Sequence, residues 1–287
     1  MAAKKNNANR RDRKELQGIT CENLSFAASE AYKLLRTNLQ FALADRPCKI
    51  IGMTSSLRGE GKSTTSVNLC YTLAQSGKRV LLIDADMRLP TIHAKMELSH
   101  AAPGLSNLLA GLCEDKESLR VSRLFNNWYI MPAGDIPPNP SELLGSEHMH
   151  ALLERFSAIF DVIVIDLPPL NIVADALVIS PWIDGLILVV RQNYTSARAL
   201  NDCMYQIEKV NARFLGFVLT DAAVGESSYK GYSYSRYGKY GKYGKYGQYG
   251  DDYGYGESTA SKKTSRAFRQ ATSGDDVFDL SGDSEKE

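Results

Sequence analysis

Short apolar segments alternate with longer amphipathic ones along most of this chain. Six segments rich in β-branched residues are apolar on both faces, which is typical of buried strands in a parallel sheet. We expect these strands at Lys49–Thr54, Arg79–Asp84, Trp128–Met131, Asp161–Asp166, Gly185–Val190 and Phe214–Leu219. The amphipathic segments between them predict helices at Lys62–Ser76, which Gly77 closes, at Ser141–Phe156 and at Ser196–Val210. Strands and helices in this order predict an α/β fold, with a mostly parallel sheet and helices on both faces.

The apolar periodicity stops after about Val224. Residues 19–224 are therefore expected to form one domain, which includes an amino-terminal helix at 29–42. Residues 1–18 are basic and predict a disordered tail, although a contact with anionic lipid is an alternative. Residues 225–257 contain a tyrosine cluster, and the acidic residues 258–287 predict a second disordered segment.

Composition excludes several classes of protein. The chain has 287 residues, 44% of them hydrophobic, which is enough for one substantial core. Its net charge of +1 argues against overall electrostatic binding of nucleic acid. The five scattered cysteines, with no CxxC pair, predict a reduced cytosolic protein without a structural metal site. We expect no transmembrane helix, because no apolar run approaches about 20 residues, and no signal peptide, because the start of the chain lacks an apolar h-region.

A phosphate-binding loop is predicted between the first strand and the helix that follows it. Backbone N–H groups and the helix N-terminus would face the phosphates, and Lys62 would supply a cation. Ser63 would place its hydroxyl on Mg²⁺. Ser56 stands where the usual pattern has its first glycine. The candidate ATP-binding residues are Ser56, Gly59, Glu60, Gly61, Lys62, Ser63 and Thr64.

Carboxylates end two of the predicted strands. Asp84 and Asp86 follow one apolar strand, and Asp166 follows another. One of the first two could deprotonate a nucleophile while the other holds metal; a simple polar cap on the strand end is the alternative. Since clustered anions favour a nearby cation, we expect the three carboxylates to converge on one metal ion.

Two arginines near strand ends have open roles. Arg88 and Arg191 could contact phosphate or base, and structural ion pairs are equally consistent with their positions.

Ten of the fifteen tyrosines lie in the tyrosine cluster, where the Tyr-Gly-Lys step repeats. Glycine at every third position predicts a flexible segment whose phenols stay exposed. They are Tyr229, Tyr232, Tyr234, Tyr237, Tyr240, Tyr243, Tyr246, Tyr249, Tyr253 and Tyr255. The first interpretation is a kinase that phosphorylates itself here. A module that stacks these rings on single-stranded nucleic acid is another.

The three motifs together resemble the Walker A, A′ and B motifs of the bacterial tyrosine kinases of capsule and exopolysaccharide synthesis. Residues 29–39 resemble that family's amino-terminal ExxRxxR helix, and Pro137–Leu144 resembles its Pro-Asn-Pro loop. Thr220-Asp221 stands where the family often has an asparagine near the adenine. ATPase switches of the partition and septum-placement type, similar to ParA and MinD, share the fold, but the tyrosine cluster is not expected of them.

The resemblance implies a P-loop NTPase-type fold with ATP and Mg²⁺ as cofactors. Lys62 and Ser63 would bind the phosphates and Mg²⁺, Asp86 and Asp166 would help hold the metal, and Asp84 would be the catalytic base. The enzyme would be a protein tyrosine kinase that autophosphorylates its tyrosine cluster in trans. It would regulate capsular or exopolysaccharide synthesis and export.

The resemblance also implies partners. Glu30, Lys33 and Arg36 would form a subunit contact that closes a phosphorylation-sensitive ring; the alternative is a helix packed on its own domain. Lys33 stands where the family has arginine, and a lysine lacks the bidentate geometry. A transmembrane polysaccharide co-polymerase would activate the kinase and recruit it from the cytoplasm to the inner face of the plasma membrane. A phosphotyrosine phosphatase is a further expected partner, and nucleic acid is not.

Overall fold

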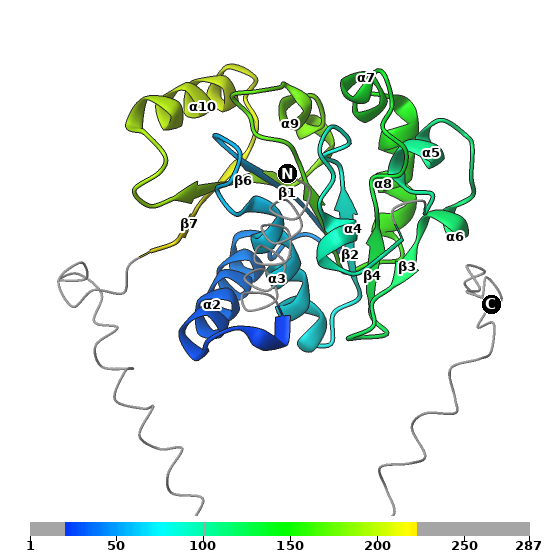
Figure 1. The fold of residues 1–287 in the computed structure, drawn as a ribbon, viewed down its shortest axis with the longest axis horizontal. Coiled ribbons are helices and arrows are strands. Elements are labelled where there is room, and N and C mark those ends of the chain that lie inside the picture. The colour runs from blue at the N-terminus through cyan, green and yellow to red at the C-terminus, as the bar shows by residue number, and fades with distance from the viewer. Residues whose placement is uncertain (1–20, 100–101, 223–287) are drawn as a thin grey trace, which may run out of the picture. The chain divides into compact units, whose positions relative to one another are not determined.

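The computed structural model describes residues 21–99 and 102–222, which form an α/β domain around a seven-stranded sheet (Figure 1). The strand order is β3-β4-β2-β5-β1-β6-β7. Every pair of neighbouring strands is parallel except β3 and β4, which are antiparallel. The strands are β1 (Lys49–Ser55), β2 (Val80–Asp84), β3 (Arg120–Val121), β4 (Trp128–Met131), β5 (Val162–Asp166), β6 (Gly185–Arg191) and β7 (Phe214–Thr220). The predicted mostly parallel sheet is confirmed, with β3 as an unpredicted addition.

The predictions for residues 1–18, 225–257 and 258–287 lie outside the described residues. This includes all ten tyrosines of the tyrosine cluster. Among the residues that the structure does describe, no helix is long and apolar enough to span a membrane.

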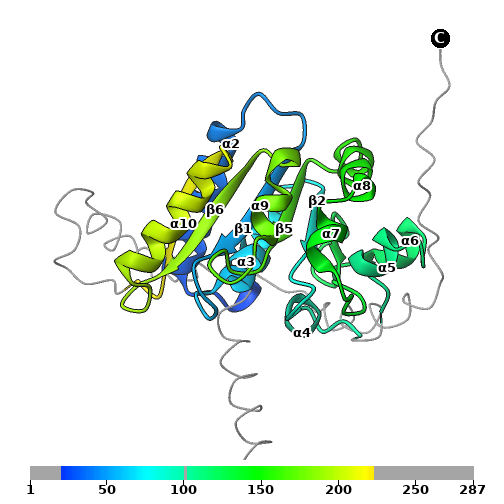
Figure 2. The same ribbon diagram turned by 90° about the horizontal axis from the view of Figure 1, so that it is seen from above.

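The helices occupy both faces of the sheet. They are η1 (Cys21–Asn23), α2 (Phe26–Ala42), α3 (Lys62–Gln75), α4 (Ile92–Lys95), α5 (Leu105–Leu109), α6 (Asp115–Ser118), α7 (Pro140–Leu144), α8 (Glu147–Ser157), α9 (Asp175–Val178), η2 (Ser180–Trp182) and α10 (Ala197–Lys209). Figure 1 shows α2 and α3 on one side of the sheet and α7, α9 and α10 on the other. Seen from above in Figure 2, α10, α9, α7 and α8 are spread across that second face. Burial of apolar side chains on both faces is what holds the two layers to the sheet.

The two faces have separate apolar cores. On one face, Leu43, the C-cap of α2, and Val67 of α3 pack in a buried cluster with Met53 of β1. On the other, Phe156 of α8 and Ile207 of α10 belong to a second buried cluster. Strands between two such layers must be apolar on both sides, which is the pattern in the sequence.

One predicted helix is two helices in the structure. The segment expected as Ser141–Phe156 is broken at Gly145 into α7 and α8. Ser146 is the N-cap of α8, where its hydroxyl accepts a hydrogen bond from the Met149 amide at 3.3 Å. A serine that satisfies a free amide of the first turn favours a new helix start over a continuous helix.

The last strand is also less buried than expected. β7 lies at the edge of the sheet, beside β6 alone. Phe217 is 51% exposed and Leu219 is 53% exposed, so this strand is not covered on both faces as its apolar sequence predicted. An edge position decides this burial, and the composition of the strand does not reveal it.

Candidate active site

The loop between β1 and α3 has the backbone that phosphate binding needs. Gly59 and Gly61 have φ angles of 80° and 90°, a left-handed region that other residues adopt at a cost. Gly61 is the N-cap of α3, so the helix N-terminus opens directly onto the loop. The predicted strand–loop–helix arrangement is therefore present, with amide groups available for an anion.

Glu60 and Ser56 point into the scaffold of this loop. The buried Glu60 carboxylate accepts hydrogen bonds from the Leu57 amide, at 2.9 Å, and from the Thr195 hydroxyl. The Thr220 hydroxyl donates to the Glu60 carbonyl at 2.7 Å. Ser56 is fully buried, and its hydroxyl has no hydrogen-bond partner within the part of the chain that the structure describes. The Glu60 side chain therefore supports the loop from the inside, which leaves the loop backbone and Lys62 to contact a nucleotide.

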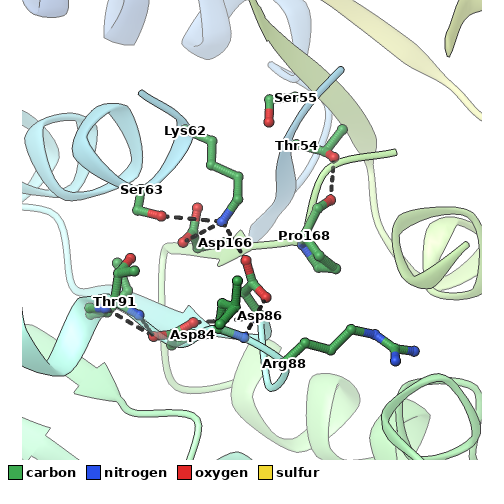
Figure 3. A network of polar contacts seen from close by, with 12 residues as sticks. Thr54, Ser55, Lys62, Ser63, Asp84, Asp86, Arg88, Thr91, Asp166 and Pro168 are labelled. Atoms are coloured by element: carbon green, nitrogen blue, oxygen red, sulfur yellow. Dashed lines mark hydrogen bonds and ion pairs between the residues drawn. The ribbon is translucent and has the colours of Figure 1, made fainter. Parts of the chain in front are cut away.

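Lys62 lies between two carboxylates, one at the end of β5 and one in the segment after β2. Its ammonium is 2.9 Å from an oxygen of Asp86, 3.4 Å from an oxygen of Asp166 and 3.2 Å from the Ser63 hydroxyl (Figure 3). Burial alone would lower the pKa of Lys62, but the charges of Asp166 and then Asp86 outweigh it and raise that pKa. Lys62 therefore keeps its positive charge where phosphates would bind.

Asp84 does not join this cluster. It is fully buried, and one carboxylate oxygen accepts from the Thr91 amide at 3.1 Å and from the Ile92 amide at 3.0 Å. Figure 3 shows the side chain turned toward Thr91, although Asp84 and Asp166 are register partners on β2 and β5. The expected convergence of three carboxylates on one cation is therefore wrong. Burial, with a further contribution from the charge of Asp166, raises the pKa of Asp84 to about 8.

The remaining oxygen donors fit Mg²⁺ bound together with a nucleotide. Among the described residues, no group of three or more His, Cys, Asp or Glu side chains is placed to hold a metal by itself. Ser63, Asp86 and Asp166 instead offer one hydroxyl and two carboxylates around Lys62. Mg²⁺ typically takes one or two carboxylates and completes its octahedron with phosphate oxygens and water.

Lys95 is a site residue that the sequence analysis missed. It ends the short helix α4, and its ammonium is 3.1 Å from the Thr64 hydroxyl at the start of α3. Burial is the main cause that lowers the pKa of Lys95, and the charge of Lys62 acts in the same direction. A second cation thus lies beside the phosphate loop. A four-residue helix leaves no periodic signal in the sequence, so nothing pointed to this lysine.

Arg88 forms a structural ion pair, which settles its open role. Its guanidinium donates to both oxygens of Asp175, at 3.1 and 3.2 Å, and to the Ser141 hydroxyl at 3.0 Å. Asp175 is completely buried, and Figure 3 shows Arg88 extending away from Lys62. The pair links the segment after β2 to α7 and α9.

Arg191 also has structural partners. It donates to the Asp221 carboxylate at 3.0 and 3.1 Å and to the Gly59 carbonyl at 3.4 Å. Thr220 and Asp221 therefore support the phosphate loop, Thr220 directly through Glu60 and Asp221 through Arg191.

The three charged residues of the amino-terminal helix make contacts within this chain. Lys33 pairs with Glu30 at 2.7 Å on the surface of α2. Arg36 donates to the Thr72 carbonyl at 2.6 Å and so ties α2 to the C-terminal part of α3. The packing of this helix on its own domain is thus observed; its role between subunits stays a prediction.

Comparison with known proteins agrees with the site. A family model described as an AAA domain matches residues 48–217. The tyrosine-protein kinase YwqD of Bacillus subtilis is 34% identical over 232 residues, which are 81% of this chain and 96% of YwqD. The chain belongs to the bacterial tyrosine-protein kinases. The solved kinase domain of the Escherichia coli tyrosine kinase ETK resembles this kinase with a TM-score of 0.65 at 31% identity, over 74% of this chain and 83% of that one.

The alternative family shares the fold with this kinase. The cell division ATPase MinD of Pyrococcus furiosus matches with a TM-score of 0.51 at 24% identity, over 60% of this chain and 71% of that one. Identity at this level shows a common P-loop architecture. It does not extend the switch function of such ATPases to the kinase.

Proposed function

We propose that this kinase transfers the γ-phosphoryl group of ATP to tyrosines of its own tyrosine cluster, and that the transfer occurs between copies of the chain. The observation that carries the proposal is the position of Lys62, held between Asp86 and Asp166 at the mouth of a phosphate loop. Ten phenols in the same chain, spaced by glycines, supply acceptors for such a site. A flexible segment of about 25 residues reaches about 25–30 Å, enough to enter a neighbouring subunit.

Each site residue has a distinct part in this reaction. The loop amides, Lys62 and Lys95 would bind and orient the phosphates, since phosphoryl transfer depends mainly on positioning and charge neutralisation. Ser63, Asp86 and Asp166 would hold Mg²⁺, which, when bound, neutralises charge on the phosphates.

Asp84 would accept the phenolic proton. A tyrosine phenol has a pKa of about 10, so an unassisted tyrosine is a poor nucleophile at neutral pH. Burial raises the pKa of Asp84 to about 8, which makes it a stronger base than an ordinary carboxylate once it is ionised.

Phosphorylation would control assembly through charge. Residues 229–255 contain Lys230, Arg236, Lys239, Lys242 and Lys245 against Asp251 and Asp252, and five minus two gives +3. With about −1.5 to −2 per phosphotyrosine, full modification brings this segment to about −12 to −17. Repulsion between such tails would loosen a ring whose subunits meet through Glu30, Lys33 and Arg36.

The kinase would act on polysaccharide synthesis at the membrane. We infer that a transmembrane activator recruits it to the inner face of the plasma membrane, where it regulates capsule or exopolysaccharide synthesis and export. A phosphotyrosine phosphatase would remove the phosphates from the tyrosine cluster. The family assignment supports this placement by its resemblance to kinases of those pathways.

One experiment tests the central claim. The full chain is incubated with ATP and Mg²⁺ and probed for phosphotyrosine, beside Lys62→Met and the matched control Lys116→Met. Lys116 is an exposed lysine on α6. We expect signal in the wild type and the control and none in Lys62→Met. A chain that stays unphosphorylated even with a candidate membrane activator would refute the proposal.

Size-exclusion chromatography before and after ATP treatment tests the ring, which should shift to smaller assemblies.

A further inference from the structure

Tyr194 touches the phosphate loop from outside. It lies in the connection between β6 and α10, and its hydroxyl donates a hydrogen bond to the Arg58 carbonyl at 3.0 Å. A Cβ atom placed on Gly59 would be 3.8 Å from this hydroxyl. The residue is nevertheless 51% exposed. A phenol that holds the loop and also faces solvent is both accessible to an enzyme and coupled to nucleotide binding.

The neighbours of Tyr194 reinforce this coupling. The Arg191 guanidinium lies 5.5 Å from the centre of the Tyr194 ring and also donates to the Gly59 carbonyl at 3.4 Å. The Thr195 hydroxyl donates to the Glu60 carboxylate. Arg191 at the end of β6 and two residues of the connection that follows it therefore hold three consecutive residues of the loop. A charge added at Tyr194 would act on all of these contacts.

We propose that Tyr194 is a second phosphorylation site, modified by another copy of the kinase, and that its modification weakens nucleotide binding. This inference rests on the proposed transfer between copies. The phenolic oxygen of Tyr194 forms a bond to the γ-phosphorus of ATP bound to the other copy. The bond between that phosphorus and the bridging oxygen breaks, ADP leaves with the electron pair, and the phenolic proton passes to the carboxylate base of the acting copy.

Two consequences follow from the new group. The ester oxygen has no proton, so the hydrogen bond to the Arg58 carbonyl is lost. The phosphate adds a charge of about −1.5 to −2 beside the loop that receives the phosphates of ATP. It also competes with Asp221 and the Gly59 carbonyl for Arg191, since a guanidinium pairs strongly with phosphate. Repulsion and a loosened loop both lower the affinity for nucleotide.

The first test locates the modification. Isotope-labelled Lys62→Met full chain is mixed with unlabelled wild type, ATP and Mg²⁺, and both chains are mapped by mass spectrometry. We expect phosphate on Tyr194 of the labelled chain as well as on its tyrosine cluster. Phosphate on the cluster without phosphate on Tyr194 overturns this inference and leaves the proposed function intact. A mixture without any phosphotyrosine contradicts the proposed function itself.

The second test measures the consequence. The wild type, Tyr194→Phe and Tyr205→Phe are each treated with ATP, freed of nucleotide and titrated with a fluorescent ATP analogue, each against its own untreated sample. Tyr205 is 65% exposed on α10 and serves as the matched control. We expect the phosphorylated fraction of the wild type and of Tyr205→Phe to bind at least tenfold more weakly, and Tyr194→Phe to change less than twofold. An equal loss in Tyr194→Phe, or unchanged binding by chains phosphorylated at Tyr194, overturns the inference.

Discussion

The Lys62 ammonium lies 2.9 Å from a carboxylate oxygen of Asp86, and both side chains are nearly buried. Lys62 begins α3 and Asp86 follows β2, so the fold places the end of one strand against the start of a helix from another motif. This relationship joins the predicted phosphate loop to the predicted A′ segment in one site. It makes the charge balance of the site sensitive to single substitutions.

Asp86→Asn should abolish most of the activity. The change removes a Mg²⁺ donor and an ionic partner of Lys62, so tail phosphorylation should fall about 100-fold or more, in line with losses of about 3 kcal/mol in transition-state stabilisation. The Mg²⁺ concentration for half-maximal rate should also rise. Initial rates across a Mg²⁺ titration measure both. Asp45→Asn, at an exposed position, is the control; a variant at position 86 with an unchanged Mg²⁺ requirement would remove Asp86 from the metal site.

Lys95→Met should weaken nucleotide binding while the protein stays folded. The substitution removes the second cation beside Thr64 but keeps an apolar chain of similar length. We expect about a tenfold loss of affinity for ATP, which corresponds to about 1.4 kcal/mol. Equilibrium titration with a fluorescent ATP analogue measures it, with Lys116→Met as the control. If Lys95→Met and Lys116→Met bind the ATP analogue with equal affinity, Lys95 does not contact the nucleotide and only supports the loop.

Arg88→Met should destabilise the fold. It leaves the completely buried Asp175 without its guanidinium, and removal of one partner of a buried ion pair costs about 3–5 kcal/mol. Because Arg88 is itself about one third exposed, we expect the free energy of unfolding to fall by about 2–3 kcal/mol. Urea denaturation measures this loss.

The double variant Arg88→Met/Asp175→Asn is the matched test of that pair. It should recover part of the loss, since an uncharged amide is less costly to bury without a cation. The single variant Asp175→Asn completes the comparison. If the losses in free energy of unfolding of Arg88→Met and Asp175→Asn simply add in the double variant, the ion pair does not account for the destabilisation.

The rate of tail phosphorylation should rise with pH. The active form of Asp84 is the carboxylate, and burial raises the pKa of Asp84 to about 8 in the ligand-free chain. Activity is therefore low where Asp84 is protonated and increases as pH rises through the midpoint. Mg²⁺ nearby favours the carboxylate, so the midpoint should lie below about 8 and move lower as Mg²⁺ is raised.

Rates from pH 5.5 to 9 at several Mg²⁺ concentrations provide the measurement. Asp84→Asn should remove this limb of the profile along with most of the activity. A profile that is flat across this range in the wild type would argue against Asp84 as the base.

Much of the fold could be read from the sequence, because local chemistry specifies it. Strands buried on both faces must be apolar on both faces, and the predicted bounds of β4 match the structure residue for residue. Gly59, Gly61 and Gly77 have positive φ angles, so their positions mark a loop and a helix end directly. The break between α7 and α8 was missed because Gly145 lies inside an otherwise continuous amphipathic pattern.

The sequence predicted most residues of the candidate site but not the contacts between their side chains. The sequence by itself determined that a phosphate loop, two acidic strand ends and a row of tyrosines belong to one chain, since each depends on residues adjacent in sequence. Only the tertiary structure decided that Asp84 turns toward Thr91, that Lys95 approaches Thr64, and that Tyr194 holds the Arg58 carbonyl. These contacts join residues from different elements, and their side-chain directions depend on how helices pack on the sheet. Local pattern carries no information on that packing, so contacts across the fold emerge only when the layers come together.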